Sequence, residues 1–159
     1  PLSYGELDRQ ARAIAALFQK YNAKGERALL LYPQGLEVLA AFCGCLYAGV
    51  IAIPVPPPES GRLKRTLPRL RSIVKDANAT FALTTANILG LIETVKDEFP
   101  EFDQMRWIDT DTVDLSLAEQ WVDPEVDKDI LAYLQYTSGS TAIPKGVMLS
   151  HFNLMHHCK

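Results

Sequence analysis

The segment from residue 136 to residue 146 combines residue types that can bind phosphate. Its last ten residues include four hydroxyl side chains, two glycines and one lysine, namely Thr137, Ser138, Gly139, Ser140, Thr141, Lys145 and Gly146. Main-chain N–H groups of a loop rich in Gly and Ser form a concave anion site, hydroxyls add donors, and a lysine supplies a movable positive charge. The segment therefore predicts a polyphosphate-binding loop. The alternative is an ordinary Ser/Gly-rich turn.

The order of these residues differs from the Walker A loop, which requires Gly-Lys-[Ser/Thr]. Here Pro144 precedes Lys145 and Gly146 follows it. Lys145 could instead be an exposed surface lysine. Gly139 and Gly146 could serve the geometry of a turn, which is compatible with phosphate binding.

Signals for strands and helices alternate along the chain up to this loop. Apolar runs and apolar residues at helical spacing predict strands at 28–32, 50–53, 80–85 and 105–108, and helices over about 3–21, 35–48, 66–76 and 87–98. Two further short strands, 130–136 and 146–149, flank the loop. The alternation predicts an α/β fold with three layers, in which helices cover both faces of a mainly parallel sheet.

Particular residues indicate where helices begin and end. Ser3 followed by Glu6 is typical of a capping box at the start of the first helix. Gly49 is a plausible stop for the second helix. His151 and Asn153, after the loop, are interpreted as helix-start residues and not as catalytic groups.

Prolines set two further expectations. Because Pro68 fits only the first turn of a helix, the third helix should begin no earlier than about Thr66. The prolines between 54 and 58 predict a stiff extended connector. After the fourth strand, the chain enters a loop-like acidic region, and the stretch 93–129 holds 13 of the 19 acidic residues. That stretch is interpreted as a solvated surface.

Composition restricts the class of partner. The 159 residues carry a net charge of −3, which argues against nucleic acid as the main partner because phosphate backbones select basic surfaces. A basic cluster between residues 62 and 75 could meet an anionic partner, although a solvated helix face is the simpler interpretation; it comprises Arg62, Lys64, Arg65, Arg69, Arg71 and Lys75. The most apolar stretch, 36–53, is too short and too interrupted to span a bilayer.

The cysteines and the first residues indicate a compartment. Cys43 and Cys45 lie two residues apart on a helix and so point to different faces, and Cys158 stands alone. No CxxC metal spacing occurs, and the adjacent His156 and His157 cannot share one helix face, so no metal site is expected. No secretory signal is visible at the N-terminus. These features favour a reducing compartment, and the cytoplasm is expected.

The order of residues around the loop resembles the phosphate-binding signature of the adenylate-forming superfamily. The resemblance lies in the segment 131–154, which reads LAYLQYTSGSTAIPKGVMLSHFNL. Within that superfamily of acyl-CoA synthetases, peptide synthetase adenylation domains and luciferases, the chain is most similar to fatty acyl-AMP ligases. The stretches that point to this subfamily are 2–8, 26–33 and 41–54, together with the Leu-Gln-Tyr lead into the loop. Ala142 departs from the pattern, since the superfamily usually has Gly there.

The resemblance implies a reaction and a role for each loop residue. Such enzymes join a fatty carboxylate to ATP, giving an acyl-adenylate and pyrophosphate, and a Mg²⁺ ion is expected to bridge phosphate oxygens. Lys145 would be the catalytic residue that steadies the departing pyrophosphate. The β- and γ-phosphates would be held by Thr137, Ser138, Gly139, Ser140, Thr141, Lys145 and Gly146. The acyl group would pass to an acyl carrier protein, often in polyketide or lipopeptide (nonribosomal peptide) assembly.

The resemblance also implies that residues 1–159 form the N-terminal subdomain of an AMP-binding domain, ending just after the phosphate loop. The protein ligand of Mg²⁺ and the adenine, ribose and acyl sites would lie further along the family's sequence, so this piece alone should be inactive. Two alternatives remain open. One is a fragment of an acyl-CoA ligase or of an amino-acid-activating domain, and the other is a non-catalytic module that binds a nucleotide or a partner.

Overall fold

A six-stranded sheet runs through the computed structural model, which describes residues 1–137 and 145–158. The strands are β1 (Arg27–Leu31), β2 (Ile51–Val55), β3 (Phe81–Thr84), β4 (Arg106–Asp109), β5 (Leu131–Thr137) and β6 (Lys145–Ser150). Their order across the sheet is β4-β3-β1-β2-β5-β6. All neighbouring pairs are parallel except β5 and β6, which form an antiparallel hairpin.

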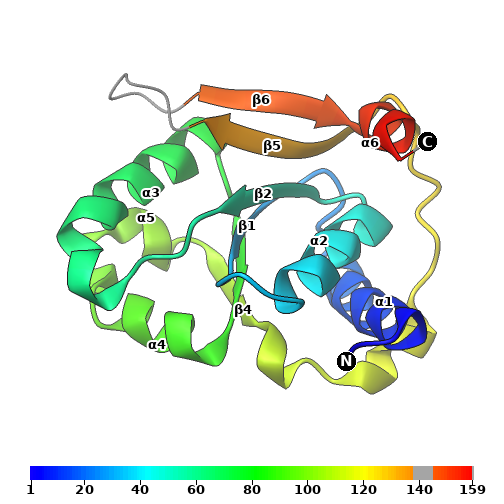
Figure 1. Ribbon diagram of the computed structural model, residues 1–159, viewed down its shortest axis with the longest axis horizontal. Helices are drawn as coiled ribbons and strands as arrows, with labels where there is room; N and C mark the ends of the chain where they lie inside the picture. The colour runs from blue at the N-terminus through cyan, green and yellow to red at the C-terminus, as the bar shows by residue number, and fades with distance from the viewer. Residues whose placement is uncertain (138–144, 159) are drawn as a thin grey trace.

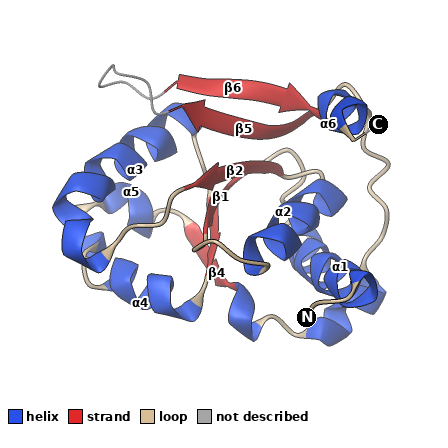
Figure 2. Cartoon of the chain, in the orientation of Figure 1, coloured by secondary structure: helices blue, strands red, loops and turns tan. Residues whose placement is uncertain are grey.

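Helices cover both faces of this sheet. They are α1 (Tyr4–Lys20), α2 (Glu37–Ala48), α3 (Leu63–Ala77), α4 (Ala86–Glu93), α5 (Pro100–Asp103) and α6 (His151–His157). Figure 1 shows α1 and α2 on one side of the sheet and α3, α4 and α5 on the other, and Figure 2 separates the helical layers from the strands by colour. The predicted three-layer α/β fold with a mainly parallel sheet is confirmed.

The core forms two clusters, one under each helical layer. Leu30 of β1 belongs to the cluster that also holds Phe18 of α1 and Ala41 of α2. Leu29 and its neighbour two residues on face the other way, into the cluster that holds Ile73 of α3. Successive side chains of a strand point to opposite faces, so the continuous apolar run of β1 fits a strand buried on both sides, as expected.

Local capping signals were reliable. The Ser3 hydroxyl accepts a hydrogen bond from the Glu6 amide at 3.2 Å, and the Glu6 carboxylate accepts one from the Ser3 amide at 2.8 Å. This capping box starts α1, as predicted. Gly49 caps α2 in the left-handed conformation with φ of 70° and so confirms the predicted stop.

The expectation for Pro68 was wrong. The helix α3 begins at Leu63, so Pro68 lies in its second turn and not in its first. A proline there removes the N–H that would bond to the Lys64 carbonyl. Both residues are exposed, so water can satisfy that carbonyl. The buried stripe of α3, which includes Leu67 and Leu70, stabilises the helix on both sides of the proline.

Two other boundaries also differ from the expectation. Pro54 does not open the connector but belongs to β2, opposite Leu30 of β1. Pro54 is the last residue but one of β2 and has no N–H to donate. Because β2 pairs with β5 only at Ala52 and Tyr133 among the described residues, the proline costs the sheet few hydrogen bonds. The helix α4 ends at Glu93, and a short 3-10 turn at Lys96–Glu98 replaces the end of the single helix expected over 87–98.

The acidic region after β4 is more structured than expected. We call residues 110–127 the strap, because this segment crosses the outer side of α1 and α2. The indole N–H of Trp121 in the strap donates a hydrogen bond to the main-chain carbonyl of Tyr47 at 2.9 Å. Gln19 of α1 exchanges two hydrogen bonds with the main chain of Val122, and Lys24 donates to the Pro124 carbonyl. The strap is thus a packed segment with an acidic outer surface.

Candidate functional site

The loop 138–144 joins β5 to β6, the last two strands in the sheet order, and lies outside the described part of the chain. Strand β5 is parallel to β2, with Tyr133 opposite Ala52. Further along β5, Tyr136 contacts Asp76 just before β3 and shares a cavity with Arg27, the first residue of β1. The base of the loop therefore lies near the amino ends of β1 and β3.

The hairpin of β5 and β6 brings the two ends of the loop together (Figure 1). In the antiparallel register, Thr137 pairs with Lys145 and Tyr136 pairs with Gly146. Three of the predicted phosphate-binding residues are thus neighbours through their main chains. The other four, Ser138, Gly139, Ser140 and Thr141, lie outside the described residues, and their role stays a prediction.

Gly146 allows an unusually close approach by an aromatic ring. A Cβ atom at this position would lie 3.0 Å from Cζ and 3.2 Å from the hydroxyl oxygen of Tyr136. Gly146 lies in β6, and its φ angle is not positive, so it adopts no left-handed turn conformation. A side chain here would force the ring of Tyr136 to shift.

The hydroxyl of Tyr136 is held by a residue from another element. It donates a hydrogen bond of 2.6 Å to Oδ2 of Asp76, near the end of α3. Partial burial raises the pKa of Tyr136, and the bond to Asp76 raises it further, so this group stays a neutral donor. Sequence reasoning missed this contact because 60 residues separate the partners and Asp76 belongs to none of the motifs that the sequence shows.

The junction between β6 and α6 confirms the assignment of the residues after the loop. The Ser150 hydroxyl accepts a hydrogen bond from the Asn153 amide, and the Asn153 side chain accepts one from the Ser150 amide. This is a second capping box, at the start of α6. The His151 amide donates to the Ile130 carbonyl at 3.0 Å. Burial lowers the pKa of the His151 side chain, which favours the neutral form. His151 and Asn153 are thus helix-start residues, as predicted.

The basic cluster on α3 is partly paired within the protein. Arg71 and Lys75 both contact Oε1 of Glu101, at 2.9 Å and 3.0 Å. The hydrogen bond from Arg71, then that from the main-chain amide of Glu101 and that from Lys75, lower the pKa of Glu101 to about 2. Arg62 lies 3.7 Å from Glu59. Much of the cluster's charge is thus offset by nearby carboxylates.

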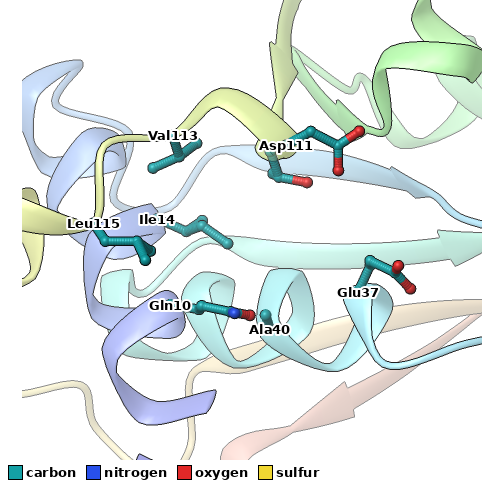
Figure 3. Close-up of a pocket in the computed structure, with 8 residues that line it drawn as sticks. Gln10, Ile14, Glu37, Ala40, Asp111, Val113 and Leu115 are labelled. Carbon is teal, nitrogen blue, oxygen red and sulfur yellow. The ribbon is translucent and has the colours of Figure 1, made fainter. Parts of the chain in front are cut away.

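A cavity of about 300 Å³ opens beside the strap and α2 (Figure 3). Two carboxylate residues line it, Glu37 at the start of α2 and Asp111 after β4, with an apolar wall that includes Ile14 and Val113. Asp111 already accepts a hydrogen bond from the Ala86 amide at 2.9 Å. Two carboxylates would repel a triphosphate. The cavity is therefore a poor alternative to the loop.

The described residues contain neither a cluster of metal ligands nor a helix that could cross a membrane. No group of three or more His, Cys, Asp or Glu side chains within 1–137 and 145–158 could hold a metal ion. In the same ranges, no helix has both the length and the apolar character that crossing a membrane requires.

Comparison with known proteins extends these observations. The family model described as "AMP-binding enzyme" matches residues 1–159. The chain is 56% identical over 158 residues to a medium-chain-fatty-acid–[acyl-carrier-protein] ligase, JamA, of Moorena producens, with 99% of this chain and 27% of that protein covered. It is 38% identical over 155 residues to the long-chain-fatty-acid–AMP ligase FadD32 of Mycolicibacterium smegmatis, with 96% and 24% covered.

The fold is similar to a solved structure of the same kind of enzyme. A fatty acyl-adenylate ligase from Legionella pneumophila, in complex with acyl adenylate and pyrophosphate, matches with a TM-score of 0.82 and 38% identity, covering 98% of this chain and 26% of that one. The chain thus spans about a quarter of the length of the relatives it matches.

Proposed function

The chain belongs to the AMP-binding enzyme family, and from this premise we propose that residues 1–159 are the N-terminal, phosphate-binding subdomain of a fatty acyl-AMP ligase. The observation that carries the proposal is the base of the loop, where Thr137 and Lys145 are paired at the carboxyl end of β5. The identity to JamA and FadD32, both fatty acid ligases by name, supports fatty acid as the acyl substrate.

The reaction defines what the loop has to do. A carboxylate oxygen of the fatty acid attacks the α-phosphorus of ATP, and the bond from that phosphorus to the β-phosphate oxygen breaks, leaving pyrophosphate with the electron pair. Both reactants are anions, so stabilisation of phosphate charge is the main contribution a protein can make. We assign the β- and γ-phosphates to the loop, with Thr137, Ser138, Ser140 and Thr141 as hydroxyl donors.

Lys145 has a separate role in this proposal. Its ammonium group would neutralise charge that develops on the departing pyrophosphate, so it acts as the catalytic residue of the segment. The amides of Gly139 and Gly146 would add donors without side chains that obstruct the phosphates. ATP is the nucleotide substrate.

Mg²⁺ would accompany the nucleotide, on its phosphate oxygens. No group of three or more His, Cys, Asp or Glu side chains within 1–137 and 145–158 could hold a metal ion by itself. We therefore assign no step of the reaction to a metal ligand in this chain.

We further propose an acyl carrier protein as the acceptor of the acyl group, which the name of the JamA relative supports.

The three cysteines, Cys43, Cys45 and Cys158, are unpaired, which supports a reducing compartment such as the cytoplasm.

Substrate-dependent exchange of pyrophosphate into ATP tests the proposal. The full-length enzyme that contains this chain should exchange labelled pyrophosphate when a fatty acid is present. It should then load a carrier protein and should not form a CoA thioester. Exchange that depends on an amino acid would replace the proposal with an amino-acid-activating domain, and CoA thioester formation would replace it with an acyl-CoA ligase. A lack of exchange with either acid would indicate a non-catalytic module.

A further inference from the structure

We propose that Tyr136 is a positioning residue for the phosphate loop, and that it acts by fixing the base of the β5–β6 hairpin to the end of α3 through Asp76. The inference rests on the proposed function, because it states how the loop of that same site is held. It concerns a residue that itself need not touch the nucleotide.

The position of Tyr136 in the hairpin is the first support. Tyr136 is the residue before Thr137, where β5 leads into the loop, and it pairs with Gly146 directly after Lys145. Its ring lies so close to Gly146 that a Cβ atom there would be 3.0 Å from Cζ. The Tyr136 side chain of β5 therefore packs against β6, the strand on the other side of the loop.

The anchor at the other end is the second support. Asp76 lies one residue before the end of α3, and its Oδ2 atom accepts the 2.6 Å hydrogen bond from Tyr136. The neighbouring residues Val74 and Ala77 are buried in the core, so the main chain that carries Asp76 is fixed by packing. The hairpin is thus held by its contact with α3 in addition to the main-chain hydrogen bonds between β5 and β6.

Arg27 lies beside the contact between Tyr136 and Asp76. A cavity of about 190 Å³ lies beside the contact, lined by Arg27, Asp76, Tyr136 and Gly146, among others. Arg27 is close enough to Tyr136 to oppose the rise in its pKa, and its guanidinium donates to the Ala77 carbonyl at 2.9 Å. A charged acceptor and a neutral donor make a stronger bond than two neutral groups.

The consequence concerns the binding of ATP. Thr137 and Lys145, at the described ends of the loop, need less ordering on phosphate binding when the hairpin that carries them is already fixed. Loosening the base should therefore weaken the interaction with MgATP specifically. Binding of the fatty acid should change little.

Four variants of the full-length enzyme test this inference. Tyr136→Phe keeps the ring and removes the donor, Asp76→Ala removes the acceptor, and Asp76→Asn keeps an acceptor oxygen. The fourth combines Tyr136→Phe with Asp76→Ala. The measurements are the KM values for MgATP and for fatty acid in pyrophosphate exchange, with melting temperature as a check on folding.

Loss of the hydrogen bond should raise the KM for MgATP about fivefold or more in Tyr136→Phe and Asp76→Ala. The KM for fatty acid should stay within about twofold of the wild type, and the double variant should resemble either single one because both remove the same contact. Asp76→Asn should lie between the wild type and Asp76→Ala, because its neutral amide oxygen can still accept a weaker hydrogen bond. An unchanged KM for MgATP, equal changes in both KM values, or additive effects in the double variant would each overturn the inference.

A second measurement separates this inference from the proposed function. Amide hydrogen exchange at residues 145–147 should be faster in Tyr136→Phe than in the wild type, whatever acid the enzyme activates. Suppose that the wild type shows no pyrophosphate exchange with fatty acid while the amides of Tyr136→Phe lose protection against hydrogen exchange. In that case only the proposed function fails. If the amides exchange at the wild-type rate, the positioning role fails.

Discussion

Gly44 of α2 lies directly against the side chain of Ile14 on α1. A Cβ atom at Gly44 would be 2.6 Å from Cγ2 of Ile14 and 3.3 Å from the main-chain oxygen of Ala11. The two helices of this layer therefore approach each other at a point where only a glycine fits, and this contact sets the distance between α1 and α2.

Gly44→Ala should destabilise the chain by about 1–3 kcal/mol, because an added methyl group must displace a buried side chain or a helix backbone. Urea unfolding of the 159-residue chain would measure the change. Gly90→Ala is a matched control, since a Cβ atom in that α4 position meets nothing within 4 Å. It should stabilise by about 0.5–1 kcal/mol. An unfolding midpoint of Gly44→Ala equal to the wild type would contradict this account of the helix contact.

The Glu101 contact with Arg71 and Lys75 predicts a dependence of stability on pH. The folded-state pKa of Glu101 is lowered to about 2, below its ordinary value of 4.5. The stabilisation is therefore complete above about pH 4.5 and is lost as the pH falls toward 2. Glu101→Gln should melt at a lower temperature than the wild type at pH 7, and the difference should shrink below pH 4.5. Melting curves of both proteins at several pH values would detect this, and a constant difference would argue against it.

Lys145→Ala in the full-length enzyme should lower the rate of adenylation at least about tenfold while the fold is retained, because a charge next to the departing pyrophosphate is removed. Pyrophosphate exchange and circular dichroism would measure the two quantities. Lys64→Ala removes a charge from the exposed face of α3 and serves as the control. Full activity of the Lys145 variant would exclude this residue from the mechanism.

The 159-residue chain by itself should bind MgATP weakly, with no saturation below about 1 mM. Phosphate contacts alone have to supply the affinity if the chain is a quarter of a longer ligase. Isothermal titration with MgATP, and with inorganic pyrophosphate as the comparison, would test this. Micromolar affinity would mean that the nucleotide site is not where we place it.

Local signals in the sequence predicted local structure well. Ser3 with Glu6 and Gly49 each specify a helix end through contacts with residues at most four positions away, so no tertiary information was needed. The rule for Pro68 failed because it considers one lost hydrogen bond and ignores the buried stripe of α3. Tertiary packing outweighed the local preference.

Contacts between distant residues could not be predicted in the same way. Trp121 bonds to Tyr47, 74 positions earlier, and this converts an acidic region that resembled a solvated loop into the packed strap. Tyr136 and Asp76 come together only because α3 and β5 end close to each other in space. For the candidate site, the sequence predicted the loop and its residues, whereas the support behind the loop depends on topology.

The antiparallel strand β6 also has a practical consequence for handling the chain. It is the last strand in the sheet order, so within the described residues its outer main-chain groups face no further strand. Val147 and Met148 on this strand are 47% and 71% exposed. Such an open border is a template for edge-to-edge association. Concentrated solutions of the 159-residue chain should therefore contain dimers and larger aggregates, and a lysine in place of Met148 should reduce their amount.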